Sequence, residues 1–248
     1  MIKLKSAREI ALMREAGRIV AECHQILAEK VRPGVTTKEL DKIIEAHIKR
    51  RGATPSFKGY NGFPGSICVA IDDVICHGFP AKERLVEGQL VTFDIGAFYK
   101  GYHGDSAWSY AVGEVRPEVR QLMERTHESL FIGIAQAKPG NRVGDISHAI
   151  QSFAEGFGYG VVRDFTGHGL GQDLHEEPPV PHFGEPGTGP LLRSGMTLAI
   201  EPMITLGTWE SKVDRDGWTA RTADGSVCVQ YEHTVAITEN GPEILTVL

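Results

Sequence analysis

The chain has 248 residues, of which 41% are apolar, 23% charged and 8% aromatic, an ordinary composition for a globular protein. A folded chain of this length buries most of its apolar surface, so its folding needs neither a disulfide nor a structural metal. The formal net charge of −6 argues against a protein that binds nucleic acid by neutralising phosphates. We find neither the apolar core of a signal peptide nor an uncharged apolar run approaching the ~20 residues of a membrane helix. The four cysteines form no CxxC pair, which indicates reduced thiols in a cytoplasmic protein.

The first part of the chain predicts two helices followed by strands. Apolar residues at helical spacing predict a helix over residues 7–30 that is closed by Pro33-Gly34. A capping box, Thr36 followed by Glu39, begins a second helix that ends near Gly52. β-rich runs then predict strands over residues 67–74, 90–98 and 102–112, with breaks at Gly101 and Gly104.

The second part repeats this order. Pro117 suits the first turn of a helix that stops at Pro139-Gly140, and residues 145–153 begin another. Strands are predicted over residues 196–205 and 226–238. The closest echo aligns residues 88–94 with residues 195–201, because in both a glycine precedes an apolar strand that ends in an acid.

The repeat predicts one α+β domain over residues 1–248, built from halves at about 7–112 and 115–240. Two helix–helix–strand halves related by a pseudo-twofold axis bring their matching strands together in one central sheet. We therefore expect a shared sheet inside, helices outside, and a cleft where the halves meet.

Acidic residues in apolar segments are the main chemical signal. Asp94, Glu201 and Glu232 each stand in an apolar strand run, and Asp105 follows a Gly-Tyr-His-Gly hairpin segment. A buried unpaired carboxylate is strongly destabilising or becomes protonated, and no basic residue is adjacent within these runs, so we expect a cation site. With His168 the set offers four carboxylates and one imidazole, which suits two ions of manganese, iron, cobalt or zinc. Two such ions activate a bridging water as hydroxide, which predicts a hydrolase.

Two histidines are candidates for proton transfer. His77 and His175 stand in loop segments shortly before a proline, where a neutral imidazole can donate to a scissile amide or polarise its carbonyl. We expect the other histidines to be structural: His24, His47, His127 and His148 in predicted helices, His103 in a turn, and His182 and His233 beside site segments.

The chain resembles the type I methionine aminopeptidase family, of bacterial type, at residues 165–182, with the sequence Phe-Thr-Gly-His-Gly-Leu-Gly-Gln-Asp-Leu-His-Glu-Glu-Pro-Pro-Val-Pro-His. The spacing of the five candidate ligands matches that family too, and the resemblance covers essentially the whole chain. It implies the pita-bread fold of the M24 metallopeptidases, in which two pseudo-symmetric halves share a curved antiparallel sheet with helices outside. It also implies that a hydroxide bridging two divalent metal ions removes the N-terminal methionine from nascent proteins and peptides with a small second residue.

The same resemblance implies roles for the five ligands. Asp94 would chelate one metal ion, and Asp105 and Glu232 would bridge both ions. His168 and Glu201 would complete the other metal position, and Glu201 would also move a proton.

The resemblance implies substrate contacts as well. His175 would stabilise the oxyanion, and His77 would contact the amide nitrogen of the scissile bond. Asn61 and Leu174 depart from the commonest family pattern, as do Phe57, Phe63 and Phe183, which leaves the pocket width open. The methionine side chain would be lined by Tyr60, Phe63, Cys68 and Trp218, with Phe57 and Leu174 nearby.

The five ligands alone leave two other functions open. Xaa-Pro aminopeptidases and dipeptidases of the same fold use the same ligands, but they usually carry an additional N-terminal domain, for which too few residues precede Asp94. Non-catalytic pita-bread proteins that only bind partners typically lack one or more ligands, and here all five are present. The resemblance further implies a cytoplasmic monomer that meets nascent chains, with the ribosome as the expected place.

Overall fold

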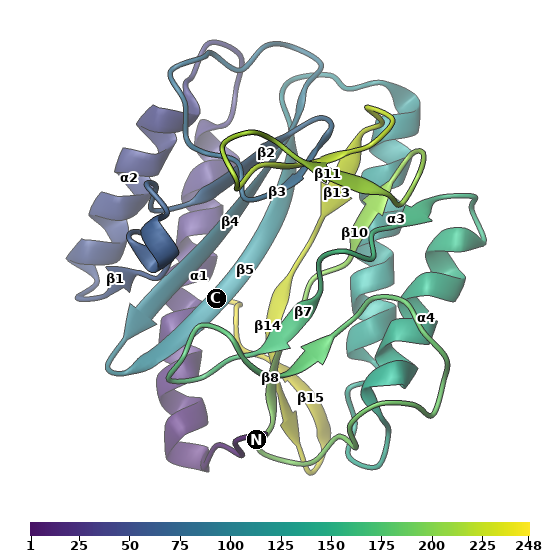
Figure 1. Ribbon diagram of the computed structural model, residues 1–248. Coiled ribbons are helices and arrows are strands. Elements are labelled where there is room, and N and C mark those ends of the chain that lie inside the picture. The colour runs from purple at the N-terminus through teal and green to yellow at the C-terminus, as the bar shows by residue number, and fades with distance from the viewer.

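The computed structural model describes all residues 1–248 and begins with two helices, α1 (Ala7–Lys30) and α2 (Thr37–Arg50) (Figure 1). Each helix starts at a capping box, at Ser6 and at Thr36. In each box the hydroxyl accepts the amide of a glutamate three residues later, whose carboxylate accepts the amide of the capping residue. These bonds satisfy free amides of the first turn, which is why both helices begin where the sequence predicts.

The strands of the first part are dominated by a long hairpin. In it, β4 (Leu90–Tyr99) and β5 (Tyr102–Ala111) pair along their whole length. The shorter elements are β1 (Thr54–Pro55), the 3-10 turn η1 (Tyr60–Gly62), β2 (Cys68–Ile71) and β3 (Val74–Cys76).

Helix α1 crosses the hairpin at glycines. Gly104 lies inside β5, so the strand break predicted there is wrong. A Cβ at Gly104 would lie 2.6 Å from the amide nitrogen of Gly17, so the glycine serves the close approach of the helix to the strand. Gly17 in turn packs against the carbonyl of Leu245, which leaves no room for a Cβ. The first helix is therefore held between the hairpin and the last residues of the chain.

The second part again opens with two helices, α3 (Pro117–Ile134) and α4 (Val143–Glu155). Helix α3 ends before the predicted stop at Pro139-Gly140, and the chain leaves it through turns. No helix of the structure combines the length and the apolar character needed to cross a membrane. The strands that follow are β6 (Gly160–Val161), β7 (Gly167–Gly169), β8 (Glu176–Val180), β9 (Thr197–Ile200), β10 (Met203–Thr205), β11 (Ser211–Val213), β12 (Ala220–Thr222), β13 (Cys228–Gln230), β14 (His233–Thr238) and β15 (Gly241–Ile244).

Three runs predicted as single strands are interrupted. Residues 67–74 turn at Asp72, whose backbone has a φ of 51°, and β3 begins after the turn. Residues 196–205 break at Glu201-Pro202, where proline has no amide to donate to a ladder. Residues 226–238 break at Tyr231-Glu232. The prediction that Glu201 and Glu232 lie within strands is therefore wrong.

The last two breaks lie opposite each other. Ile200 pairs with His233 on one side of them, and Met203 pairs with Gln230 on the other. At these breaks both segments pass between the sheet that contains β9 and β14 and the sheet that contains β10 and β13.

The strands form antiparallel sheets between two pairs of helices. In Figure 1, α1 and α2 lie on one side and α3 and α4 on the other. One buried apolar cluster joins α1 and α2 to β4, and another joins α3 and α4 to β9 and β14. The predicted α+β class is confirmed. The sheets have the orders β1–β4–β2 with β5 on β4, β15–β14–β9–β7–β8, β13–β10–β6, and β11–β12–β3.

Candidate active site

A cavity of about 290 Å³ lies where these sheets meet. Its wall contains acidic and histidine side chains together with aromatic and apolar ones, but no lysine or arginine. Every site residue predicted from the sequence lines it, namely Asp94, Asp105, His168, Glu201, Glu232, His77, His175, Tyr60, Phe63, Cys68 and Trp218.

The β4–β5 hairpin supplies two of the acids. Asp94 lies opposite Ala107, two residues beyond Asp105 on β5, so both aspartates project from the same face. Asp94 Oδ1 and Asp105 Oδ1 are buried and have no hydrogen-bond partner. Buried oxygens of this kind are expected to have a ligand that satisfies them.

The other two acids come from the paired strand breaks. The amide of Glu232 donates to the carbonyl of Ala107 at 2.8 Å, which ties this break to the hairpin. Glu201 is held by its amide, which donates to His182 Nε2 at 3.1 Å, and by Gln230, whose Nε2 donates to Glu201 Oε2 at 3.1 Å. Because Glu201 and Glu232 lie outside the strand pairing, their side chains can reach the cavity.

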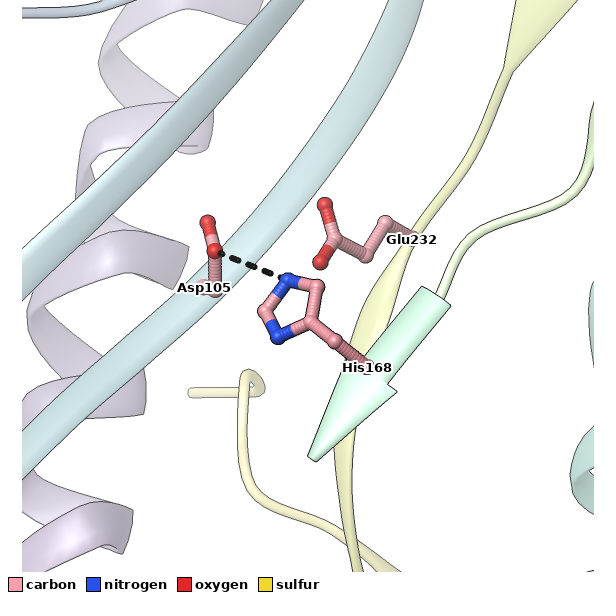
Figure 2. Close-up of side chains that lie close together, drawn as sticks. All are labelled: Asp105, His168 and Glu232. Carbon is pink, nitrogen blue, oxygen red and sulfur yellow. Dashed lines mark ion pairs between the residues drawn. The ribbon is translucent and has the colours of Figure 1, made fainter. Parts of the chain in front are cut away.

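His168 on β7 faces the acids (Figure 2). Its Nδ1 lies 2.9 Å from the carbonyl oxygen of Gly169, so Nδ1 carries the proton and donates. Its Nε2 lies 3.9 Å from Asp105 Oδ2 and 3.7 Å from Glu201 Oε1. A lone pair on Nε2 thus points to the carboxylates, an arrangement typical of metal-ligating histidines.

Burial raises the pKa of all four acids, and repulsion between the acids adds to the effect in three of them. Removal from water raises the pKa of Asp94 to about 7. It raises the pKa of Asp105, Glu201 and Glu232 well above the usual range, and the neighbouring acids raise it further. Burial lowers the pKa of His168 to about 3, so its imidazole is neutral.

The donor set fits divalent cations. Ligand atoms of Asp105, His168 and Glu232 all lie within 4.8 Å of one another. The oxygens and the neutral imidazole nitrogen are the ligands that manganese, iron, cobalt and zinc accept. Cations would also satisfy the two unpartnered aspartate oxygens.

His77 and His175 stand beside the acids. Burial lowers the pKa of both imidazoles, so both are neutral at pH 7. The hydroxyl of Tyr60 lies 2.8 Å from His175 Nδ1, which leaves Nε2 available to a substrate. His77 has a φ of 60°, a conformation that non-glycine residues rarely adopt and that is enriched at functional sites.

An apolar pocket forms the rest of the wall. Phe57, Phe63, Cys68 and Leu174 are buried against each other, and Phe79 and Trp218 pack on them. The rings of Phe63 and Trp218 meet edge to face with centroids 5.3 Å apart.

Sequence reasoning missed Gln230 and misplaced one histidine. Gln230 precedes Glu232 by two residues, a spacing that marks a shared strand face, but the break between them hides this signal. His103 lies in β5, not in a turn, and Ser56 Oγ lies 2.8 Å from its Nδ1. His182 is fully buried, and its Nε2 accepts the amide of Glu201, in line with the structural role expected for it.

Comparisons with known proteins agree with this geometry. The profile of metallopeptidase family M24 matches residues 11–239. The chain is 53% identical to methionine aminopeptidase 1 of Bacillus subtilis, and the match covers 99% of each protein. The crystal structure of the Thermotoga maritima methionine aminopeptidase is similar with a TM-score of 0.98 and 45% identity, covering 100% of both chains. The Pyrococcus furiosus prolidase is more distant, with a TM-score of 0.78, 26% identity and coverage of 65% of that chain.

Proposed function

The chain belongs to metallopeptidase family M24, and from this membership and the cavity we propose that it is a methionyl aminopeptidase, a hydrolase that removes N-terminal methionine from peptides. The observation that carries the proposal is the joining of a buried carboxylate cluster to an apolar pocket in one cavity. Full-length similarity to methionine aminopeptidases also confirms the predicted pita-bread fold.

Membership of this family implies divalent metal ions, and the buried donors fit them. Bound ions would polarise the scissile carbonyl and lower the pKa of a water molecule. Two ions match the charge of four carboxylates, with cobalt, manganese, iron or zinc as candidates. The residues that would hold them are Asp94, Asp105, His168, Glu201 and Glu232.

The two parts of the cavity select the end of a chain. The apolar pocket takes the methionine side chain, because soft, adaptable walls suit a thioether. The free α-amine, which a residue inside a chain does not have, would lie beside the residues that hold the metal ions. The first peptide bond then lies beside His77 and His175.

Three side chains handle charge and protons. His175 donates from Nε2 to the carbonyl oxygen as negative charge develops, while Tyr60 holds Nδ1. His77 donates to the amide nitrogen of the bond that breaks. Glu201, whose carboxylate accepts a hydrogen bond from Gln230, accepts and delivers a proton.

The test is methionine release from Met-Ala-Ser by metal-reconstituted protein, with Ala-Pro-Ala in parallel. Release from Met-Ala-Ser alone supports the proposal. Cleavage of Ala-Pro-Ala instead would assign the chain to the proline-specific peptidases. If the metal-loaded protein cleaves neither peptide, the proposed substrate is wrong.

The same proposal includes the preferred substrates, their source, and the state and location of the protein. The preferred substrates have a small second residue, and nascent chains at the ribosome are their source. The protein acts as a monomer in the cytoplasm, where its four free cysteines remain reduced.

A further inference from the structure

A buried ion pair joins the start of the chain to the loop that carries His175. Lys5 Nζ lies 2.6 Å from Glu176 Oε2, and the two side chains are only 5% and 3% exposed. Removing one partner of so buried a pair strands the other charge away from water. Neither residue is part of the cavity wall, so the mechanism above does not explain the pair.

Both partners are held in place. The amide of Lys5 donates to the carbonyl of Gly195 at 2.7 Å, and its Nζ also donates to the carbonyl of Lys3 at 3.3 Å. Glu176 Oε1 accepts the amide of Asp173 at 3.3 Å, which closes the turn before His175. The pair therefore links the segment before β9 to residues 173–176.

A glycine leaves the space that the lysine fills. A Cβ on Gly171 would lie 2.5 Å from Lys5 Cε and 2.8 Å from Glu176 Oε1. The carbonyl of Gly171 accepts the amide of His103 at 2.8 Å, and its own amide donates to the carbonyl of Asp173 at 3.0 Å. The lysine stem thus packs on a loop whose backbone is also bonded to β5.

We propose that Lys5 is a positioning residue for His175, acting through the carboxylate of Glu176. Glu176 directly follows His175, so fixing its carboxylate fixes the backbone from which the imidazole projects. The imidazole then stays within 2.8 Å of the Tyr60 hydroxyl and inside the cavity. This inference rests on the proposed function, because the step it supports is donation by His175.

The first test is Lys5→Met, which removes the charge and keeps most of the stem. We expect kcat for methionine release to fall about 10–100-fold, because small displacements of a catalytic group have effects of that size. KM and the metal content should stay near the wild-type values, because the pocket and the ligands are not touched. Lys3→Met is the matched control: Lys3 pairs with Asp173 at 2.8 Å and reaches Glu176 Oε1 only at 3.5 Å, and its side chain is 52% exposed, so its loss should change kcat less than twofold.

A double-mutant cycle separates positioning from general damage. In a His175→Ala background, Lys5→Met should change kcat little further, because the group it positions is already absent. A full, multiplicative loss in that background would overturn the proposal. So would a Lys5→Met variant with wild-type kcat.

Two further measurements cover a failure to fold and a failure of the proposed function. The double variant Lys5→Met, Glu176→Gln leaves no stranded charge, and we expect it to fold with reduced kcat, whereas wild-type kcat would overturn the proposal. Hydrogen exchange of amides 170–176 does not depend on activity and should accelerate at least about tenfold in Lys5→Met. If the wild-type protein releases no methionine, the proposed function is wrong, and exchange alone decides whether Lys5 holds the loop. Unchanged hydrogen exchange of these amides in Lys5→Met would overturn the proposal that Lys5 holds the loop.

Discussion

At the scale of single residues, four carboxylates share one cavity without a lysine or arginine in its wall. Two backbone features place the acids: a face of the β4–β5 hairpin places two, and the opposed strand breaks at Glu201 and Glu232 place the other two. Their raised pKa values follow from burial and from each other. A cluster of this kind is unfavourable by itself and becomes favourable with cations.

Glu232→Gln removes one negative charge at nearly constant shape. We expect metal affinity to fall by more than about 100-fold, the upper range for partners outside the ligand shell, and methionine release to fall with it. Calorimetric titration with manganese measures the metal affinity, and elemental analysis measures the metal content. Glu243→Gln is the control, because Glu243 lies on β15 and bonds Arg14 at a half-exposed site. Full metal content and full turnover in Glu232→Gln would contradict a ligand role.

His77→Ala tests proton donation apart from metal binding. Turnover should fall about 10²–10⁴-fold, the usual range for a positioned acid or base, with metal content unchanged. Steady-state kinetics and elemental analysis on one preparation give both numbers. Unchanged kinetics with full metal would remove His77 from the mechanism.

At the scale of elements, glycine contacts set the position of α1 relative to the hairpin. Gly104→Ala would place a methyl group against the backbone of α1 next to Asp105. We expect a loss of about 3 kcal/mol in the free energy of unfolding, the upper end for overpacking, together with weaker metal binding. Ala107→Gly on the same strand should lose only about 1 kcal/mol. Urea unfolding of both variants gives the comparison, and equal losses would show that crowding at α1 is not the cause.

The same elements show how far the sequence predicts the fold. A cap is a local signal, so the start of α2 is predicted from Thr36 and Glu39, and the apolar spacing predicts the start of α1 at about Ala7. The break at Tyr231-Glu232 has no local signal, because it depends on pairing with the strand interrupted by Pro202. The acids are visible in the sequence because they stand in apolar runs, whereas the residues of the apolar pocket are predicted only by the family resemblance. Gln230 and Lys5 are missed because they act through partners that only the fold brings near.

At the scale of the whole molecule, the buried acids couple stability to pH. A carboxyl whose pKa is raised in the folded state binds more protons folded than unfolded, so its stabilising effect is lost as pH rises through the folded pKa. Between pH 7 and 8.5 the histidines and cysteines of the unfolded chain also change protonation, and comparison with Glu232→Gln, which keeps all of them, removes their contribution to the slope. Each carboxyl still protonated when folded should lower the free energy of unfolding of the metal-free protein by about 1.4 kcal/mol per pH unit.

Urea unfolding followed by tryptophan fluorescence at several pH values measures this slope. Glu232→Gln should reduce it, and saturating manganese should reduce it as well, because cations replace the protons. Equal slopes for the wild-type protein and Glu232→Gln would show that Glu232 is already ionised when folded.

The packing of Gly17 against the carbonyl of Leu245 also bears on how the chain folds during its own synthesis. Thr246, next in sequence, bonds His233 Nδ1 at 2.7 Å, so the final residues brace the strand that follows Glu232. At about 5–20 residues per second, translation separates Gly17 from Leu245 by about 10–45 s. Helix α1 spends that time without its last packing partner, and the segment around Glu232 is braced only when the final residues have left the ribosome. Competence to bind metal is therefore expected only after Leu245 and Thr246 have left the ribosome and packed.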